Sequence, residues 1–229
     1  MKFDEYNIKA RILPSIIILI PILLFFNNCK IDNIQVVFNN LLSVKIIGNV
    51  TLSIALLFLL VQVNRYIGKY IFEKRMYKKE LDMPTTIFLL YSNSEFSKEY
   101  KNRLRKQIEN DFFIILPDEQ LENTNLLETK KRIIEAVGLI RHKVKNGRLL
   151  LQHNIEYGFF RNFIGGSIIG LLISAFNIFY FYIINDKLIF GINIGLSSLF
   201  ALLFIFHRPI IINLGNQYAK RLFQEYLAK

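Results

Sequence analysis

The chain has 229 residues, of which 52% are hydrophobic and 21% are charged, and 29 Lys and Arg against 18 Asp and Glu give it a net charge of +11. These totals alone would fit a soluble protein, but the mean hydropathy is +0.31 and the apolar residues lie in a few long runs. One ordinary soluble globule is therefore excluded. The single cysteine, Cys29, excludes an internal disulfide and a cysteine-based zinc site.

Four long apolar runs follow one another along the chain. They cover residues 12–26, 46–63, 163–184 and 188–206. A helix needs about 20 mainly apolar residues to cross a bilayer, so the sequence predicts four transmembrane helices, of which the first is short. Only residues 185–187 separate the last two runs, which predicts a helical hairpin.

Basic residues are divided unevenly between the segments that flank these runs. Of the 29 Lys and Arg, 26 lie in residues 1–11, 64–162 and 208–229. The other three are Lys30, Lys45 and Lys187. Because cytoplasmic loops are enriched in Lys and Arg, both termini and the middle segment are predicted to face the cytoplasm. We therefore expect a multi-pass protein of the inner (cytoplasmic) membrane, with the lipid bilayer as its first partner.

The chain is thus predicted to have four parts. They are an N-terminal segment with two transmembrane helices (1–63), a basic cytosolic domain (64–162), a transmembrane hairpin (163–207) and a basic cytosolic tail (208–229). Apolar residues at helical spacing predict a mainly helical cytosolic domain, with at most one or two short strands. The expected fold class is an all-α membrane protein, with two plus two transmembrane helices and the cytosolic domain inserted between the pairs.

Two segments of the cytosolic domain carry predictions about burial. Residues 112–116 (FFIIL), just before Pro117, predict a buried strand or a buried turn. Residues 125–145 predict a helix that ends at Asn146 and Gly147. Its expected buried positions are Leu126, Leu127, Ile133, Ile134, Val137, Leu139 and Ile140.

Clusters of basic residues in the cytosolic domain indicate contact with negative charge. The candidates are Lys98, Arg103, Arg105, Lys106, Lys130, Lys131, Arg132, Arg141 and Lys143. One interpretation is a solvated helix face close to anionic lipid. The other is a site for a polyanion, meaning a nucleotide or a short nucleic acid, whose phosphates would be bound by Lys and Arg.

Glycine pairs and lone asparagines mark the hairpin. Gly166 and Gly170 form a GxxxG pattern in the third run, and Gly191 and Gly195 form one in the fourth. Such faces let helices approach closely, either within one hairpin or between subunits of a homo-oligomer.

Asn177 and Asn193 lie at similar depth in the two helices of this hairpin. They could hydrogen-bond to each other across the hairpin or line a polar path through an oligomer.

The junction before the third run holds the candidate coupling residues Glu156, Arg161 and Asn162. A continuous connection there could transmit a movement of the cytosolic domain to the membrane helices. No nucleotide-binding, hydrolase or metalloprotease motif occurs. His153 and Glu156 could share a helix face but lack a third ligand. We therefore predict no enzyme activity, no metal and no cofactor.

Three stretches of the sequence carry a resemblance to known proteins. They are EYNIKARILP at residues 5–14, MPTT at 83–86 and NIEYGFFRN at 154–162. They resemble a widespread group of small prokaryotic multi-pass membrane proteins, similar in design to the membrane effectors of anti-phage defence, with Hailong-type effectors the nearest. The resemblance implies an antiviral role beside an operon-encoded cytosolic partner that makes nucleotides or senses nucleic acid.

Together these features predict an oligomeric membrane effector. Its cytosolic domain would sense a polyanionic signal or a partner, and its helices would form an ion channel or disrupt the membrane. The alternative from another class is a membrane anchor or scaffold that recruits a cytosolic enzyme. A membrane-bound lipid-modifying enzyme is disfavoured, because acids and histidines do not cluster near an interface.

Overall fold

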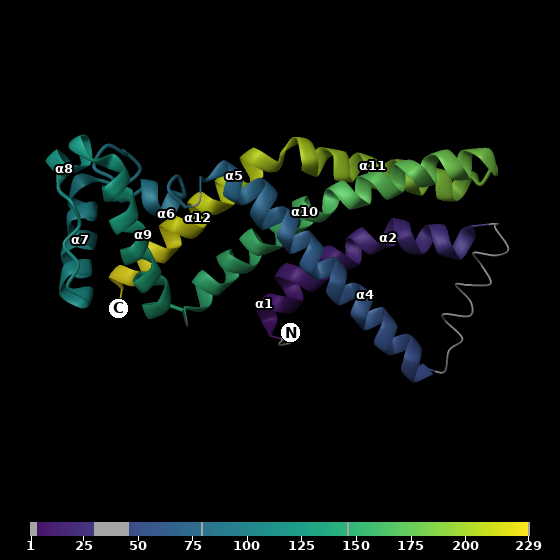
Figure 1. Ribbon diagram of the computed structural model, residues 1–229, viewed down its shortest axis with the longest axis horizontal. Helices are drawn as coiled ribbons and strands as arrows, with labels where there is room; N and C mark the ends of the chain where they lie inside the picture. Colours follow the sequence, from purple (N-terminus) through teal and green to yellow (C-terminus); the bar gives the residue numbers. More distant parts are fainter. Residues whose placement is uncertain (1–3, 30–45, 79, 146, 229) are drawn as a thin grey trace. The chain divides into compact units, whose positions relative to one another are not determined.

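The computed structural model describes residues 4–29, 46–78, 80–145 and 147–228, and all regular structure in these ranges is helical (Figure 1). The chain forms two compact units. The first unit consists of Met1–Phe72 and Gly158–His207, and the second unit of Glu73–Tyr157 and Arg208–Lys229. Lys30 and Lys45, which the charge count placed on the outer side, lie outside the described residues.

The first unit is built from long apolar helices. They are the continuous run of α1 (Glu5–Asn7), the π-helix η1 (Ile8–Ile12) and α2 (Leu13–Asn28), then α4 (Ile46–Tyr66) with the π-helix η2 (Ile67–Glu73), α10 (Arg148–Ile183) and α11 (Lys187–Ile205). Among the described residues, four stretches are long and apolar enough to cross a membrane, namely Glu5–Asn28, Ile54–Met76, Arg148–Ile183 and Lys187–Ile205. The predicted all-helical class with four such helices is confirmed at this level.

The helices extend beyond the apolar runs that predicted them. The first begins at Glu5, where the Asp4 side chain accepts a hydrogen bond from the Asn7 backbone N–H at 2.8 Å. An N-terminal cap of this kind can start a helix well before its apolar part. At 36 residues, α10 is about 54 Å long by helical rise, so only part of it can lie in a hydrocarbon core about 30 Å thick.

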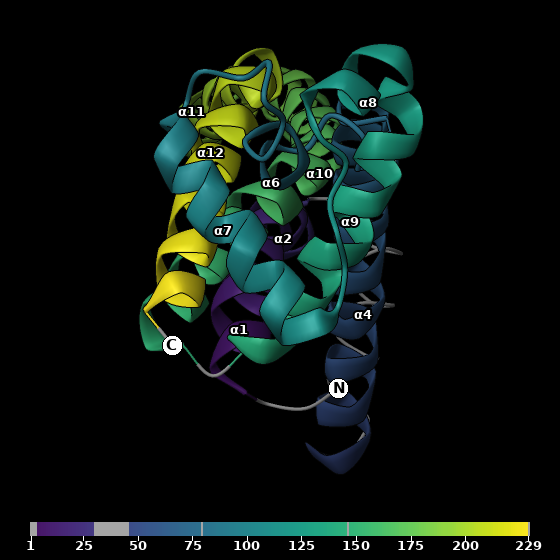
Figure 2. The ribbon, with the colours of Figure 1, turned by 90° about the vertical axis from the view of Figure 1, so that its left-hand side faces the viewer.

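The second unit is a small helical domain. Its helices are α5 (Lys74–Met76), α6 (Pro84–Ile87), α7 (Lys98–Phe112), α8 (Glu119–Thr124), α9 (Leu126–Lys143), the first turns of α10, and α12 (His207–Leu227). Side chains of Ser97, Asp118 and Asn125 cap α7, α8 and α9. In Figure 2 α7 is seen in front, with α9 and α12 on either side of it, and all three contribute to one apolar core.

The C-terminal helix α12 is part of this core. Ala219, Leu222, Phe223 and Tyr226 are fully buried. Their spacing of three and four residues places them on one face of the helix. Residues 208–229, which the sequence set apart as a basic tail, therefore belong to the same compact unit as residues 73–157.

The expected buried strand or turn at residues 112–116 is wrong. α7 continues to Phe112, and Phe113 ends it in the left-handed region with φ 56°. Phe113 and Ile115 are 91% and 69% exposed, and only Leu116 is buried. The described residues contain no strand with which this segment could pair.

The predicted burial along α9 is correct in its centre and wrong at three leucines. Ile133, Val137 and Ile140 are buried, and Ile134 is half-buried. Leu126, Leu127 and Leu139 are exposed. Leu127 and Leu139 fall to either side of the buried stripe, and Leu126 lies in the first turn, so none of them reaches the core.

Candidate functional site

Two buried asparagines join three helices of the first unit. Asn177 on α10 donates from Nδ2 to Asn193 Oδ1 on α11 at 3.0 Å and to the backbone oxygen of Pro21 on α2 at 2.7 Å. Asn193 donates to the backbone oxygen of Ile189 at 2.8 Å. Both side chains are fully buried. Within one chain, the two asparagines therefore form the direct hydrogen bond that their matched depth indicated.

A third asparagine donates a hydrogen bond to a backbone carbonyl that a proline leaves without its helical N–H donor. Pro14 has no N–H to offer the carbonyl of Ala10, four residues earlier. Asn162 on α10 donates to that carbonyl from Nδ2 at 2.7 Å, and its side chain is buried. The candidate coupling residue Asn162 thus ties α10 to the first helix.

A fourth asparagine, which the sequence analysis missed, joins α4 to the same helix. Asn64 donates from Nδ2 to Ser15 Oγ at 3.0 Å, and Ser15 Oγ donates to the carbonyl of Arg11 at 2.9 Å. Asn64 and Ser15 are fully buried. Their signal in the sequence is that Ser15 is a polar residue inside the first apolar run and Asn64 directly follows the second.

The two GxxxG patterns have different surroundings. A Cβ at Gly166 would lie 2.8 Å from side-chain atoms of Asn64 and Ile18, and one at Gly170 would lie 2.7 Å from the ring of Phe200. These glycines are therefore needed for packing within one chain. A Cβ at Gly191 or Gly195 would meet no atom within 4 Å, and both residues are exposed.

A close contact between helix backbones uses glycines that the GxxxG patterns did not identify. A Cβ at Gly68 would lie 2.3 Å from the backbone oxygen of Arg161, and one at Gly165 would lie 2.2 Å from that of Asn64. Backbone thus meets backbone where α4 and η2 cross α10. The coupling candidate Arg161 takes part in this contact through its carbonyl.

Arg105, one of the nine basic candidates, is buried inside the second unit. Its guanidinium donates to the backbone oxygens of Pro117 at 2.6 Å and Leu89 at 2.8 Å, and it lies 4.0 Å from the centre of the Tyr91 ring. Burial lowers the pKa of Arg105. The nearby Lys101 is also buried and donates to the backbone oxygens of Leu90 and Asn93. Arg105 therefore fixes a turn of the chain and is not presented to a ligand.

Three further basic candidates are paired with acids of the same unit. Lys130 contacts Asp82 at 2.7 Å, Arg141 contacts Glu80 at 3.6 Å and Lys143 contacts Asp111 at 2.6 Å. The hydrogen bond from Lys130 lowers the pKa of Asp82, and that from Lys143 lowers the pKa of Asp111. These contacts join α9 to residues 80–82 and to α7.

The remaining five candidates are exposed on two helices. Lys98, Arg103 and Lys106 lie on α7, and Lys131 and Arg132 lie on α9. Lys98 is 3.9 Å from Glu119, and Arg132 is 3.7 Å from Glu128. Of the nine residues, these five are exposed, the side chains of Lys130, Arg141 and Lys143 are partly buried in their ion pairs, and Arg105 is buried.

The candidate coupling residue Glu156 takes part in local contacts on α10. It accepts a hydrogen bond from Gln152 at 3.2 Å and lies 3.7 Å from His153 Nδ1. The residues that the structure describes contain no group of three or more His, Cys, Asp or Glu side chains that could hold a metal.

The end of α4 and the start of η2 carry outward-facing polar residues that the sequence did not single out. A hollow of about 340 Å³ is lined there by Gln62, Val63, Arg65, Tyr66 and Tyr70. No protein-family model, curated protein or solved structure matches this chain, so its function has to be argued from its own residues.

Proposed function

We propose that the chain is an oligomeric membrane effector. The second unit would receive a polyanionic signal or a partner on the cytoplasmic side, and the helices of the first unit would form a pore or disrupt the bilayer. The observation that carries the proposal is the open face of α11, where Gly191 and Gly195 are exposed with space around them. Small residues four apart let membrane helices approach closely, so this face suits a second copy of the chain.

The oligomer is tested by filling that face. At Gly191 and Gly195 an added Cβ meets no atom within 4 Å and both positions are exposed, so we expect Gly191→Leu and Gly195→Leu to keep the fold while helix association weakens. Particle mass in detergent or nanodiscs, measured by mass photometry, should fall towards the single chain. Gly138→Leu is the matched control, because Gly138 on α9 also has no atom within 4 Å of an added Cβ. An unchanged mass in both α11 variants would contradict the proposal.

Membrane activity separates an effector from a scaffold. Expression of a triggered effector should depolarise cells, which a voltage-sensitive dye would report, whereas a scaffold with inert helices should leave the membrane potential unchanged. The α11 variants should lose depolarisation together with oligomer formation. Depolarisation by a purely monomeric variant would favour bilayer disruption over a pore.

For the signal, we propose a nucleotide or a short nucleic acid bound by the exposed cations of α7 and α9. Changing Lys98, Arg103, Lys106, Lys131 and Arg132 to Glu should abolish binding of a short oligonucleotide, and binding by the unchanged protein should weaken as salt rises. Arg105 is left out because its guanidinium is already bonded. Oligonucleotide binding that depends neither on salt concentration nor on these substitutions would contradict a polyanion site on α7 and α9.

A role in anti-phage defence is proposed from the resemblance in residues 5–14, 83–86 and 154–162. Cells that carry the gene with its neighbours should survive phage infection better than cells with the Gly195→Leu variant. Equal plaque counts would reject this role while leaving membrane activity open.

One observation favours the scaffold alternative. Phe113 and Ile115 are exposed on the charged second unit. Apolar side chains so exposed often mark a contact with another protein. Phe113→Ser should weaken recruitment of an operon-encoded partner without changing depolarisation if the two roles are separate.

A further inference from the structure

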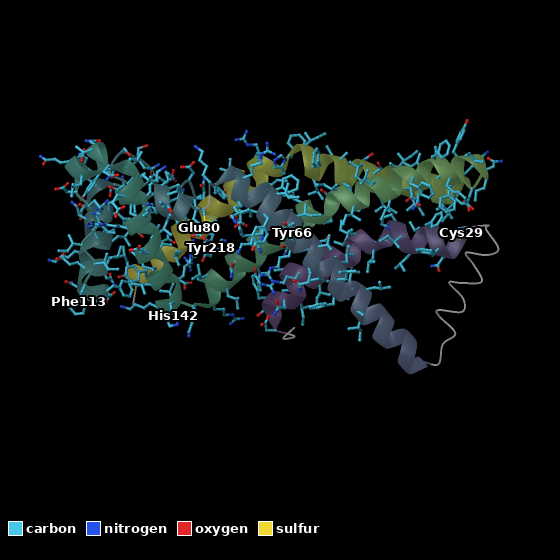
Figure 3. The ribbon with its side chains drawn as sticks, in the orientation of Figure 1. Cys29, Tyr66, Glu80, Phe113, His142 and Tyr218 are labelled. Atoms are coloured by element: carbon cyan, nitrogen blue, oxygen red, sulfur yellow. The ribbon has the colours of Figure 1, made fainter. Side chains whose placement is uncertain are left out.

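One outward face of α4 and η2 brings together two cations and two phenols. Arg65 and Lys69 are four residues apart, and so are Tyr66 and Tyr70. The two tyrosine rings lie 5.0 Å apart, and both are exposed. Figure 3 labels Tyr66 on this helix. Together with Gln62 and Val63, Arg65 and the two tyrosines line the hollow of about 340 Å³.

The orientation of this face follows from the packing on the other side of the helix. Asn64 and Gly68 are buried against α2 and α10, through the hydrogen bond to Ser15 and the close approach to Arg161. Tyr66 lies two residues from both of these buried positions and Tyr70 lies two residues after Gly68, so both rings fall on roughly the opposite side of the helix from the packed face. Within the first unit, the described helices leave these two tyrosines 61% and 48% exposed.

The two cations have no acid partner in the part of the chain that the structure describes. Lys130, Arg141 and Lys143 are each paired with a carboxylate. No such pair involves Arg65 or Lys69 among the described residues, and Lys69 Nζ lies 5.9 Å from the centre of the Tyr70 ring. Two positive charges with no carboxylate partner among the described residues, and with phenol hydroxyls beside them, suit a phosphate, which accepts hydrogen bonds from both kinds of group.

The site lies where an apolar surface meets a polar one. Leu59 is 59% exposed and sits one turn before Val63 and two turns before Tyr66, on the same side of the helix. Arg65 comes directly after the charge-free run. Tyrosine is enriched at the membrane–water interface, and basic residues are enriched in the cytoplasmic segments beside it, where both kinds of side chain can reach the lipid headgroups. A molecule that fits the whole surface has an acyl chain and a phosphate.

We propose that this face is a binding site for an anionic phospholipid. The phosphate would lie between Arg65 and Lys69, the phenols of Tyr66 and Tyr70 would donate to its oxygens, and an acyl chain would lie along Val63 and Leu59. The inference depends on the helices spanning a bilayer but not on pore formation. It names the lipid and not a soluble phosphate, because the apolar half of the surface would otherwise stay uncovered.

The test compares lipids on the purified full chain in a neutral detergent. Titration with short-chain phosphatidylglycerol, followed by native mass spectrometry, should show tighter binding than titration with phosphatidylcholine of the same chain length. Arg65→Gln with Lys69→Gln should weaken phosphatidylglycerol binding by about tenfold and leave phosphatidylcholine binding unchanged. Tyr66→Leu with Tyr70→Leu should also weaken it, and Arg65→Lys with Lys69→Arg should restore it.

Two controls decide between this site and simpler explanations. Lys131→Gln with Arg132→Gln removes the same charge from exposed positions of the second unit and should leave lipid binding unchanged. Equal losses in both double variants would overturn the proposal in favour of nonspecific charge attraction. Glycerophosphoglycerol, the headgroup without acyl chains, should bind far more weakly than the lipid. Equal binding would make the site one for soluble phosphates, and equal binding of the two lipids would also reject the proposal.

Discussion

At the scale of single residues, the first unit is held together by amide side chains. Asn162, Asn64 and Asn177 donate to Ala10, Ser15 and Pro21, which are spread along the first helix. Hydrogen bonds between membrane helices are expected to be strong, because a polar group without a partner is unfavourable in hydrocarbon. Their measured contributions to stability nevertheless average well below 2 kcal/mol. These contacts specify which helices are neighbours more than they add to stability.

The two hairpin asparagines should behave unequally when changed to leucine. Asn177→Leu removes the bonds to both Asn193 and Pro21, whereas Asn193→Leu leaves Asn177 still bonded to Pro21. We expect a cost of about 1–2 kcal/mol for the first and about 0.5–1 kcal/mol for the second, measured by denaturation in detergent.

The double variant separates packing from pore lining. If the pair serves only packing, it should be no less stable than Asn177→Leu and should retain normal ion flux in liposomes. A greater loss of flux in the double variant than in either single variant would instead assign both residues to a pore.

A buried carboxylate in the second unit predicts sensitivity to acid. Burial alone would raise the pKa of Glu122, but hydrogen bonds from Ser92 and from the Tyr91 N–H, which lies 2.7 Å from the carboxylate, lower it overall. The pKa of Asp111 is lowered as well. Groups with a depressed folded pKa stabilise the fold above their unfolded pKa, about 4, and this contribution is lost as the pH falls through the folded value.

Thermal unfolding between pH 7 and about pH 2.5 measures this effect. Stability from these groups should be constant down to about pH 5 and fall below about pH 4. Glu122→Gln should be less stable at pH 7 and show a shallower fall in acid. Glu135→Gln, at an exposed position of α9, should have the same stability as the unchanged protein at each pH. Identical acid profiles for both variants would show that Glu122 does not contribute.

At the scale of elements, two helices cross at a distance that only glycine permits. The Cβ of alanine at Gly68 would lie 2.3 Å from the backbone oxygen of Arg161, so η2 and α10 would have to separate. Gly68→Ala should therefore destabilise the first unit by about 1–3 kcal/mol.

Gly138→Ala is the control for this change. Its Cβ meets nothing, and alanine favours the helix, so it should be neutral or stabilising. Melting temperatures in detergent compare the two variants. Equal melting temperatures would mean that the crossing can relax without cost.

The C-terminal helix should be required for the second unit to fold. Phe223 on α12 is fully buried and its ring lies 5.9 Å from that of Phe96. Phe223→Ala should cost about 3–5 kcal/mol and leave a cavity. Ile212→Ala on the same helix removes an apolar side chain that is 40% exposed and should cost far less. Limited proteolysis compares the stability of the two variants. If residues 208–229 did not pack in the core, both variants would be cleaved at the same rate as the unchanged protein.

At the scale of the whole molecule, the distribution of charge predicts the orientation in the membrane. A reporter fused at the C-terminus or after Tyr91 should show a cytoplasmic location, and one inserted at Asp186 should show the opposite side. Alkaline phosphatase and fluorescent-protein fusions measure this. An outer location for residues 73–157 would contradict the proposed function, because a cytoplasmic signal could not then reach the second unit.

The sequence by itself determined the elements that depend on long, uninterrupted patterns. Four apolar runs were enough to predict four helices, because a membrane-spanning helix needs only length and apolarity and no particular neighbour. The hydrogen bond between Asn177 and Asn193 was one of the two alternatives that the sequence offered, since similar distances from the turn place the two side chains at about one depth.

Only the tertiary structure decided which neighbours the remaining residues meet. Lys98 and Arg105 look alike in sequence, yet one is exposed and the other is bonded to two carbonyls, because burial depends on segments far along the chain. Gly68 and Gly191 likewise differ in whether another backbone approaches them. The burial of one face of α12 and the exposure of Tyr66 beside Arg65 have the same explanation. A local pattern shows that a helix has two different sides, but only long-range packing determines which side is covered.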